Sequence, residues 1–430
     1  MPGTGKRLGR EFGKLWTAAT VSGLGDGVTQ IAGPLLAVSI TRSPVQVAGL
    51  MVAQQLPWML FALPTGAMVD RADRRRAMAS ASVARAAALT ALGVMVLLGH
   101  GSMPLLYVIF FAVGSAGLVF ENAATAVLPA LVGRSGLERA NGRLQSATTL
   151  ARSLVAQPLG AWLFALAAWV PFLLDATGLV LVAGLAAALP ALVNAAPAQG
   201  AGPTMRAAMQ EGVCWLLGHR LLRTLAVTVA ISNVGLGGVF AVFVLVARER
   251  LGVGSVGYGL LLAASALGGI AGGLLAARAI AAIGAGWVLR VEMVVEILTY
   301  LGLALTRSAV IAGVLFALLG LHLVMFSTVS ASLRQSLAPP GMLGRVHGAY
   351  RMVSNGGMLA GAALGGLVSA YAGLTAPSWL GFTAMTAVTV VVWGTLSNDG
   401  IRAARQSGKE GQDGAADRRR SAPGAGAPRG

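Results

Sequence analysis

The chain has 430 residues, of which 56% are hydrophobic and only 11% are charged. Soluble domains are about 45–50% apolar and about 25% charged. This composition excludes a water-soluble globule, a disordered protein and a nucleic-acid-binding domain for most of the length. The single cysteine, Cys214, excludes an intramolecular disulfide and a cysteine-rich metal site. The sequence predicts an all-α integral membrane protein.

Twelve apolar stretches follow one another, and each is close to the roughly 20 residues that a helix needs to cross a bilayer. In chain order they cover residues 16–40, 45–69, 77–99, 104–130, 140–167, 170–193, 222–247, 255–277, 287–306, 309–332, 346–372 and 376–396. The first stretch follows four basic residues, as in a signal peptide, but its 25 residues contain no clear cleavage site. We therefore expect an uncleaved first span.

Basic residues are distributed unevenly between two alternating sets of loops. Of the 32 Lys and Arg residues, 25 lie in the termini and near the loops after the even-numbered stretches, and four lie in the opposite loops. The positive-inside rule then places both termini in the cytoplasm of a multi-pass cell-membrane protein. The net charge of +17 therefore indicates topology and not a nucleic-acid partner, and the basic tail is expected to be disordered.

The two halves of the chain resemble each other at a separation of about 206 residues. Arg139–Leu144 and Arg345–Tyr350 open the fifth and eleventh stretches with similar residues, and the same offset aligns Gly160 with Gly366. This predicts two parallel six-helix halves, an arrangement that places a substrate near the membrane midplane between them. The expected division is a cytoplasmic N-terminus at 1–15, bundles at 16–193 and 222–396, a linker with an amphipathic segment at 194–221, and the tail at 397–430.

The segment after the second stretch carries a glycine, an acid and a run of arginines. Its pattern is formed by Gly66, Asp70, Arg71, Arg74 and Arg75. This pattern resembles the loop 2–3 signature of the major facilitator superfamily, although Asp73 replaces one of its glycines. The resemblance implies a gating loop that latches the two halves on the cytoplasmic side. The alternative is that these arginines only follow the positive-inside rule.

Further stretches resemble the enterobactin-exporter and macrolide-efflux branch of that superfamily. They are Trp16–Ile40 with its Gly25-Asp26 pair, Leu128–Val132, Leu137–Leu144 and Pro171–Ala176. The resemblance covers the chain to about Ser397. It implies the twelve-helix major facilitator fold and proton-coupled export of a small amphipathic or hydrophobic compound, such as an antibiotic, a drug or a siderophore. The antiporter motif of the fifth span remains only as Gln157–Ala161, a departure from the proton-antiport pattern.

Charged side chains inside a membrane span are costly and are therefore candidates for function. Asp26 lies about ten residues into the first stretch, close to the midplane at about 1.5 Å per residue, and three glycines surround it. The candidates for proton coupling are Asp26, Glu121, Arg152 and His322. The alternatives are a carboxylate permanently hydrogen-bonded between helices for Asp26 and a satisfied core histidine for His322.

Other polar side chains in the spans suggest an ion pair and a substrate cavity. Arg85 and Glu121 have similar depth in neighbouring stretches, which predicts a buried pair that is either structural or part of a proton relay. The cavity candidates are Asp26, Gln54, Gln55, Arg152, Asn233 and Arg351. The two arginines in that set could hold an anionic group of the cargo or a carboxylate of the protein.

Three further acids have structural interpretations. Asp175 in the sixth stretch is expected to form an interhelical hydrogen bond. Glu292 and Glu296 share one helix face through their i, i+4 spacing, and both lie toward the cytoplasmic end beside Arg290. We expect these two glutamates to form a water-accessible interfacial cluster.

The sequence carries no motif for ATP hydrolysis or another enzymatic reaction. It has no GxxxxGK[ST] phosphate loop, no HExxH pair and no GxSxG elbow. We expect a monomeric, non-enzymatic transporter without cofactor or metal, whose partners are a small-molecule substrate, protons and the lipid bilayer. The competing expectations are an importer or facilitator of a polar nutrient with the same fold, and a polytopic membrane protein that transports nothing.

Overall fold

The computed structural model describes residues 9–133, 136–190, 205–339, 342–402 and 406, and all regular secondary structure in these ranges is helical. Residues 1–8 of the predicted N-terminus, the first part of the linker and most of the tail lie outside the described residues. Residues 10–15 belong to the first helix. Residues 398–402 are helical, so disorder stays a prediction only for the rest of the tail.

The first half of the chain forms six helical rods. They are α1 (Arg10–Ile40), α2 (Pro44–Arg71), α3 (Arg74–Leu97), α4 (Met103–Val132), a continuous rod of α5 (Leu137–Thr149), the π-helical η2 (Leu150–Val155) and α6 (Ala156–Leu166), and finally α7 (Val170–Ala187). Each rod corresponds to one of the predicted apolar stretches.

The second half begins with a short linker helix and continues with six more rods. They are α8 (Met205–Gly218), α9 (Arg220–Leu245) running into the π-helical η3 (Val246–Arg250), α10 (Ser255–Ile283), α11 (Ala285–Leu305), α12 (Ala309–Leu337), α13 (Leu343–Ala372) and α14 (Ala376–Val392). Within the described ranges, seven helices are individually long and apolar enough to cross a bilayer.

Local sequence explains where several helices begin and end. Pro44 occupies the first turn of α2, where its missing N–H costs nothing. The Asp73 carboxylate accepts hydrogen bonds from two backbone N–H groups in the first turn of α3, at 3.0 and 3.3 Å. At the ends of α4, α10 and α13, Gly133, Gly284 and Gly373 have φ angles of 68°, 83° and 90°, a region that glycine adopts without strain.

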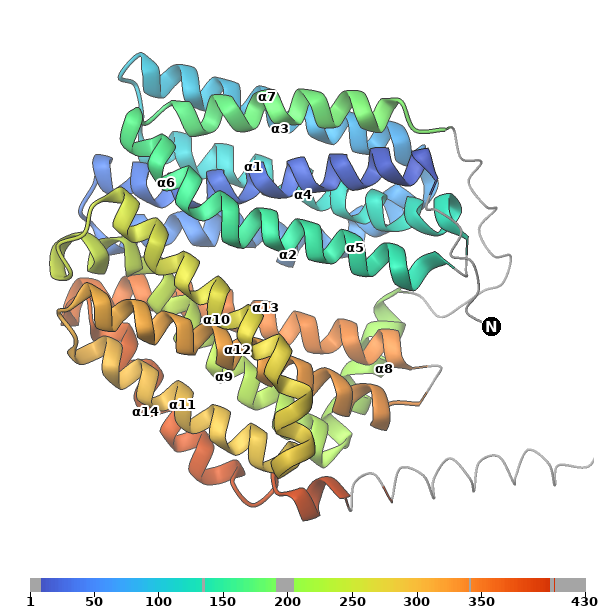
Figure 1. The fold of residues 1–430 in the computed structure, drawn as a ribbon, viewed down its shortest axis with the longest axis vertical. Helices are drawn as coiled ribbons and strands as arrows, with labels where there is room; N and C mark the ends of the chain where they lie inside the picture. Colours follow the sequence, from blue (N-terminus) through green and yellow to red (C-terminus); the bar gives the residue numbers. More distant parts are fainter. Residues whose placement is uncertain (1–8, 134–135, 191–204, 340–341, 403–405, 407–430) are drawn as a thin grey trace, which may run out of the picture.

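The helices pack into two bundles, one formed by α1–α7 and the other by α9–α14 (Figure 1). Helix α8 lies at the same end of the molecule as the start of α1 (Figure 1). We call this end the linker end. The opposite end, where α1 ends and α2 begins, is called the distal end.

Glycines bring helices of the C-terminal bundle into backbone contact. A Cβ added at Gly357 of α13 would lie 2.5 Å from the carbonyl oxygen of Ala230 in α9. Helices α10 and α12 meet in the same way, because a Cβ at Gly272 would lie 2.5 Å from the carbonyl oxygen of Leu321. Small residues are what permits this close approach in membrane helices, where van der Waals packing drives association.

The two bundles touch each other at the distal end through α2 against α13 and through α6 against α10. A Cβ at Gly366 of α13 would lie 2.6 Å from the Cβ of Ala48 in α2. A Cβ at Gly259 of α10 would lie 2.5 Å from the Cβ of Ala161 in α6. These glycines therefore allow direct helix-to-helix contact between the bundles.

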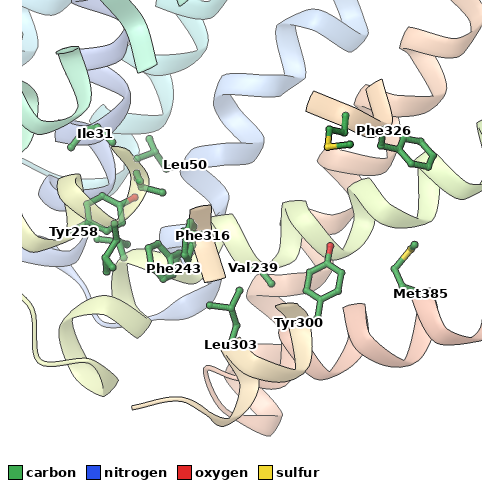
Figure 2. Packing of buried hydrophobic residues seen from close by; sticks show 14 of the residues in the cluster. Ile31, Leu50, Val239, Phe243, Tyr258, Tyr300, Leu303, Phe316, Phe326 and Met385 are labelled. Atoms are coloured by element: carbon green, nitrogen blue, oxygen red, sulfur yellow. The ribbon is translucent and has the colours of Figure 1, made fainter. Parts of the chain in front are cut away.

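A hydrophobic core crosses this distal contact. The buried side chains of Ile31 and Leu50 from the N-terminal bundle belong to the same cluster as Phe243, Tyr258 and Phe316 from the C-terminal bundle (Figure 2). The rings of Phe243 and Phe316 have centroids only 4.2 Å apart. Apolar packing thus holds the two bundles together at the distal end.

Candidate functional site

Asp26 in α1 forms an ion pair with Arg85 in α3, in the interior of the N-terminal bundle. The Arg85 side chain is 2% exposed and also donates from Nη1 to Ser22 Oγ at 3.0 Å, whereas the Asp26 side chain is 24% exposed. A guanidinium buried this deeply needs a carboxylate partner. The structure therefore corrects the predicted Arg85–Glu121 pair, because Arg85 turns toward α1 and not toward α4.

Glycine beside Asp26 lets a third helix approach α1. A Cβ at Gly25 would lie 2.6 Å from the Cγ of Asp175 in α7. Asp175 is buried and accepts a hydrogen bond of 2.6 Å from the hydroxyl of Thr29 in α1. This contact confirms the interhelical hydrogen bond predicted for Asp175.

Glu121 of α4 stands among charges contributed by both bundles. Arg152, Asp26, Arg351 and Arg85 all act on it electrostatically, and Arg351 belongs to α13 of the opposite bundle. Glu121 is nevertheless exposed, as are Arg152 and Arg351. Solvent therefore reaches charged side chains from both bundles that act on one another. Together with the partly exposed Asp26, these side chains are four of the predicted site residues.

Arg152 lies in the π-helical turn η2, which packs against α1. A Cβ at Gly27 of α1 would lie 3.1 Å from the carbonyl carbon of Arg152. Single π-helical turns inside α-helices are frequent at functional sites. The sequence places Arg152 midway through its span, but no feature of the sequence indicated the π turn.

Arg351 makes a contact that joins the two bundles. Its guanidinium carbon lies 4.7 Å from the ring centroid of Trp58 in α2, in cation–π geometry. The predicted cavity residues Gln54 and Gln55 are half-buried one turn earlier on α2. The sequence analysis did not predict a tryptophan at this site. The helical spacing of three and four residues between Gln55, Gln54 and Trp58 was the signal that could have indicated Trp58.

Asn233, another predicted cavity residue, is engaged inside the C-terminal bundle. Its Nδ2 donates to Ser354 Oγ on α13 and to the Val229 carbonyl oxygen of its own helix, each at 2.9 Å. The amide therefore joins α9 to α13.

His322 in α12 bridges two carboxylates of α11. Its Nδ1 lies 3.2 Å from Glu292 Oε2 and its Nε2 lies 3.1 Å from Glu296 Oε2, and none of the three side chains is more than 4% exposed. We call Glu292, His322 and Glu296 the C-terminal cluster. The expectation of a water-accessible interfacial group is wrong for the two glutamates: they do share a helix face, but α12 covers that face.

Two hydroxyl groups complete the contacts of Glu296. Ser232 Oγ in α9 donates to Glu296 Oε1 at 2.6 Å, and the Tyr300 hydroxyl lies 3.1 Å from the same oxygen. Three helices of the C-terminal bundle, α9, α11 and α12, therefore meet at one buried polar centre.

A family model described as "Transmembrane secretion effector" matches residues 9–400, which include both bundles and the linker helix. The chain belongs to this family of major facilitator transporters. It is accordingly a multi-pass membrane protein of the transporter type, which agrees with the predicted superfamily and fold.

Two curated relatives of this transporter come from mycobacteria. Uncharacterized MFS-type transporters of Mycobacterium tuberculosis and Mycobacterium bovis are each 31% identical to it over 162 residues, which cover 37% of this chain and 35% of each relative. The matched part therefore spans about a third of the length of these relatives.

Solved structures of other transporters share the fold of this major facilitator chain. A bacterial homologue of the iron transporter ferroportin, crystallised in an inward-facing state, has a TM-score of 0.72 at 16% identity and covers 91% of this chain and 100% of that one. The nucleoside transporter NupG has a TM-score of 0.70 at 12% identity, with 90% of this chain and 98% of that one covered. These identities establish a common fold alone.

The predicted gating loop of this transporter is described in part. Arg74 Nη1 donates to the carbonyl oxygen of Ala126 in α4 at 2.9 Å, which ties the start of α3 to the linker end of α4. Arg75 Nη2 lies 3.8 Å from Asp73 Oδ2. Gly66 is half-buried in α2. The predicted side-chain roles of Asp70 and Arg71 fall outside the described part of the structure.

Proposed function

We propose that this chain is a secondary active transporter that exports a small amphipathic or hydrophobic compound by proton-coupled alternating access. One observation carries the proposal: Asp26, Arg152 and Arg351, which come from both bundles, all act electrostatically on the exposed Glu121, while apolar contacts hold the bundles together at the distal end. Charged groups at such depth are costly and mark substrate or ion pathways.

The orientation follows from the distribution of basic residues. The termini and the segments near the loops after the even-numbered stretches contain 25 of the 32 Lys and Arg residues, so we place the linker end and both termini on the cytoplasmic side of the cell membrane. In this orientation cargo would enter from the cytoplasm, at the end opposite the distal contact. The resemblance to the enterobactin-exporter and macrolide-efflux branch supports export as the direction.

The site offers groups for both parts of an amphipathic cargo. The Trp58 ring and the neighbouring apolar residues of α2 would contact its hydrophobic part, and Gln54 and Gln55 would hydrogen-bond its polar part. Arg152 and Arg351 would bind a negatively charged group. Asp26 and Glu121 are the acids at this site that would exchange protons during the cycle.

Transport requires the distal contact to open and the linker end to close. We propose that the bundles at 16–193 and 222–396 rock as units and that Gly66, Asp70, Arg71, Arg74 and Arg75 latch the cytoplasmic side. The passage lies within one chain, so a monomer would suffice, and no catalytic group or cofactor takes part.

Inside-out membrane vesicles provide the test, because the cytoplasmic face is then outside. Respiration acidifies their interior, so an exporter would accumulate a fluorescent probe inside. We would compare ethidium, a cationic aromatic probe, with carboxyfluorescein, an anionic one. We expect the wild type to accumulate at least one of them, a protonophore to abolish the accumulation, and Asp26→Asn to abolish it in a protein that is inserted normally.

A matched control changes an acid on the surface. Asp399 pairs with Arg402 at an exposed position, so Asp399→Asn should accumulate probe as the wild type does. Accumulation that survives the protonophore, or that Asp26→Asn leaves at the wild-type rate, would contradict proton coupling at this site. Uptake of a polar nutrient into intact cells, with no export of either probe, would favour an importer.

A further inference from the structure

The C-terminal cluster contains two acids and one base, and the described residues around it provide no cation. The charged groups that act on His322 are Glu292 and Glu296. Of the helices packed against α11, α14 has no ionisable residue, and α10 has Tyr258 and Arg278. Arg278 is exposed and bonds a carbonyl of its own helix, while Tyr258 packs in the distal core.

The remaining helices around the cluster place their charges elsewhere. The ionisable side chains of α9, α12 and α13 other than His322 are Arg220, Arg223, Arg334, Arg345, His347, Tyr350, Arg351 and Tyr371. None of them acts on His322 electrostatically. On α11 itself, Arg290 bonds the backbone carbonyl of Trp393, and Tyr300 faces Glu296.

The charge of the cluster is therefore unbalanced unless a proton binds. Both ring nitrogens of His322 face carboxylate oxygens, so while both glutamates are ionised the two contacts are hydrogen bonds only when the ring carries two protons. An imidazolium between two carboxylates has a net charge of −1. An uncompensated charge in a buried site is costly, and one more proton would remove it.

The two glutamates differ in how well their negative charge is stabilised. Glu296 lies within hydrogen-bond distance of three donor groups, on Ser232, Tyr300 and His322, and donors stabilise the ionised form of a carboxylate. Glu292 faces His322 alone among the described residues. The additional proton is therefore held more favourably by Glu292, on the carboxylate oxygen that does not face the ring.

We propose that Glu292 is a proton-binding residue of this transporter and that the C-terminal cluster is its proton site in the C-terminal bundle. The step is the transfer of one proton from a hydronium ion to a carboxylate oxygen: one O–H bond of the hydronium ion breaks, one O–H bond forms on the carboxylate, and water is left. The use of this site in transport rests on the proposed function, whereas the binding of the proton does not.

The geometry favours a proton over a metal ion. The two carboxylates approach opposite nitrogens of the same ring, so a single ion could not be bound by all three side chains. Within the described ranges, no group of His, Cys, Asp and Glu residues is arranged to hold a metal.

The internal repeat gives an independent reason to expect a titratable group here. Asp26 and Ser232 are separated by 206 residues, and Arg85 and Glu292 by 207, close to the offset that relates the two halves. In the N-terminal bundle the arginine at this location pairs with the carboxylate of Asp26. In the C-terminal bundle Glu292 replaces the arginine and Ser232 replaces the aspartate, so an acid stands in place of the cation and a bound proton would neutralise it.

Infrared spectroscopy of the purified full-length protein can detect this proton without any cargo. The C=O stretch of a protonated carboxyl group is resolved from the rest of the spectrum, and its intensity is followed as a function of pH. We expect a band that titrates in the wild type and is lost in Glu292→Gln. Asp399→Asn is the matched control and should keep the band, because this acid is exposed and pairs with Arg402.

A second variant covers the case in which Glu292→Gln does not fold. Glu292→Asp keeps the carboxyl group but shortens it, so the band should persist with a shifted midpoint or frequency. A band that Glu292→Gln leaves in place, or a spectrum and midpoint that Glu292→Asp leaves unchanged, would overturn the proposal. Vesicle transport measured in parallel separates this failure from failure of the proposed function, since the infrared result is independent of cargo and direction.

Discussion

Arg85 on α3 is bound to Asp26 on α1, and the guanidinium of this pair is buried while the carboxylate is partly exposed. The same carboxylate acts electrostatically on Glu121. The pair thus connects the packing of the N-terminal bundle to the charged groups of the candidate site.

The ion pair leads to a prediction for stability. Asp26→Leu or Arg85→Leu alone leaves a charge without its partner, which typically costs about 3–5 kcal/mol of unfolding free energy. The double variant removes both charges and should be more stable than either single variant. Thermal unfolding of the protein in detergent checks this order, and a double variant less stable than both single ones would contradict it.

The glycine contact between α9 and α13 leads to a second prediction. A Cβ at Gly361 would lie 2.7 Å from Cα of Val234, and neither backbone can move without disturbing the bundle. Overpacking of this kind usually lowers the free energy of unfolding by about 1–3 kcal/mol, so Gly361→Ala should lower the unfolding temperature. Gly184→Ala is the control, since nothing lies within 4 Å of its added Cβ. Equal unfolding temperatures for the two variants would argue against the close contact.

The distal contact can be tested by cross-linking. Cys214 is the one cysteine of the chain, so Cys214→Ser gives a background without thiols. In this background we predict that Ala48→Cys combined with Gly366→Cys forms a disulfide. The two Cβ positions are 2.6 Å apart and disulfide-bonded Cβ atoms are about 3.8 Å apart, so the helices need to separate by only about 1 Å. Oxidation should stop vesicle transport, and a reductant should restore it.

The two single-cysteine variants are the controls for this experiment. Neither should respond to the oxidant, because one thiol at the distal contact has no partner. Full transport by a quantitatively cross-linked double variant would mean that the distal contact does not have to open.

A pH effect is expected at the start of α9. The Nδ1 of His219 accepts a hydrogen bond from the backbone N–H of Leu222 at 3.4 Å, which requires the unprotonated nitrogen. Burial lowers the pKa of His219 from 6.5. The unfolded state therefore binds the proton more readily, so the stabilisation is complete above pH about 6.5 and is lost as the pH falls through the lower pKa of the folded state.

Tryptophan fluorescence can follow this change, because the rings of Trp215 and His219 have centroids 5.6 Å apart. We predict that acidification changes the emission of Trp215 in the wild type. His219→Asn keeps a capping side chain but removes the titration, so its emission should stay constant over the same range. Identical titrations of the two proteins would rule out His219 as the origin.

The sequence predicted the helices and the depth of charged residues within the spans well. It did not predict the direction in which their side chains point. Apolar stretches and basic loops indicated the order of the helices, and the depth of Asp26 followed from its distance to the helix end. Depth alone did not reveal that Arg85 faces α1, because the rotation of a helix in a bundle depends on packing with its neighbours.

The acids of α11 show the same difficulty. Glu292 and Glu296 share a helix face, as their spacing indicates, but the histidine that faces them lies 26 or more residues away in sequence on α12. Their position near one helix end suggested contact with water. Their burial depends on the packing of α12 against α11, which the local sequence does not show. The π-helical turn at Arg152 likewise has no local sequence signal.

The glycine contacts of α9 with α13 and of α10 with α12 also limit how this protein can move. Helices whose backbones touch cannot slide along each other without a clash. The C-terminal bundle should therefore move as a rigid body. The bundle would then separate as one unit along the surface where α2 meets α13 and α6 meets α10. Substitutions along that surface should alter the rate of switching more than the tightness of cargo binding.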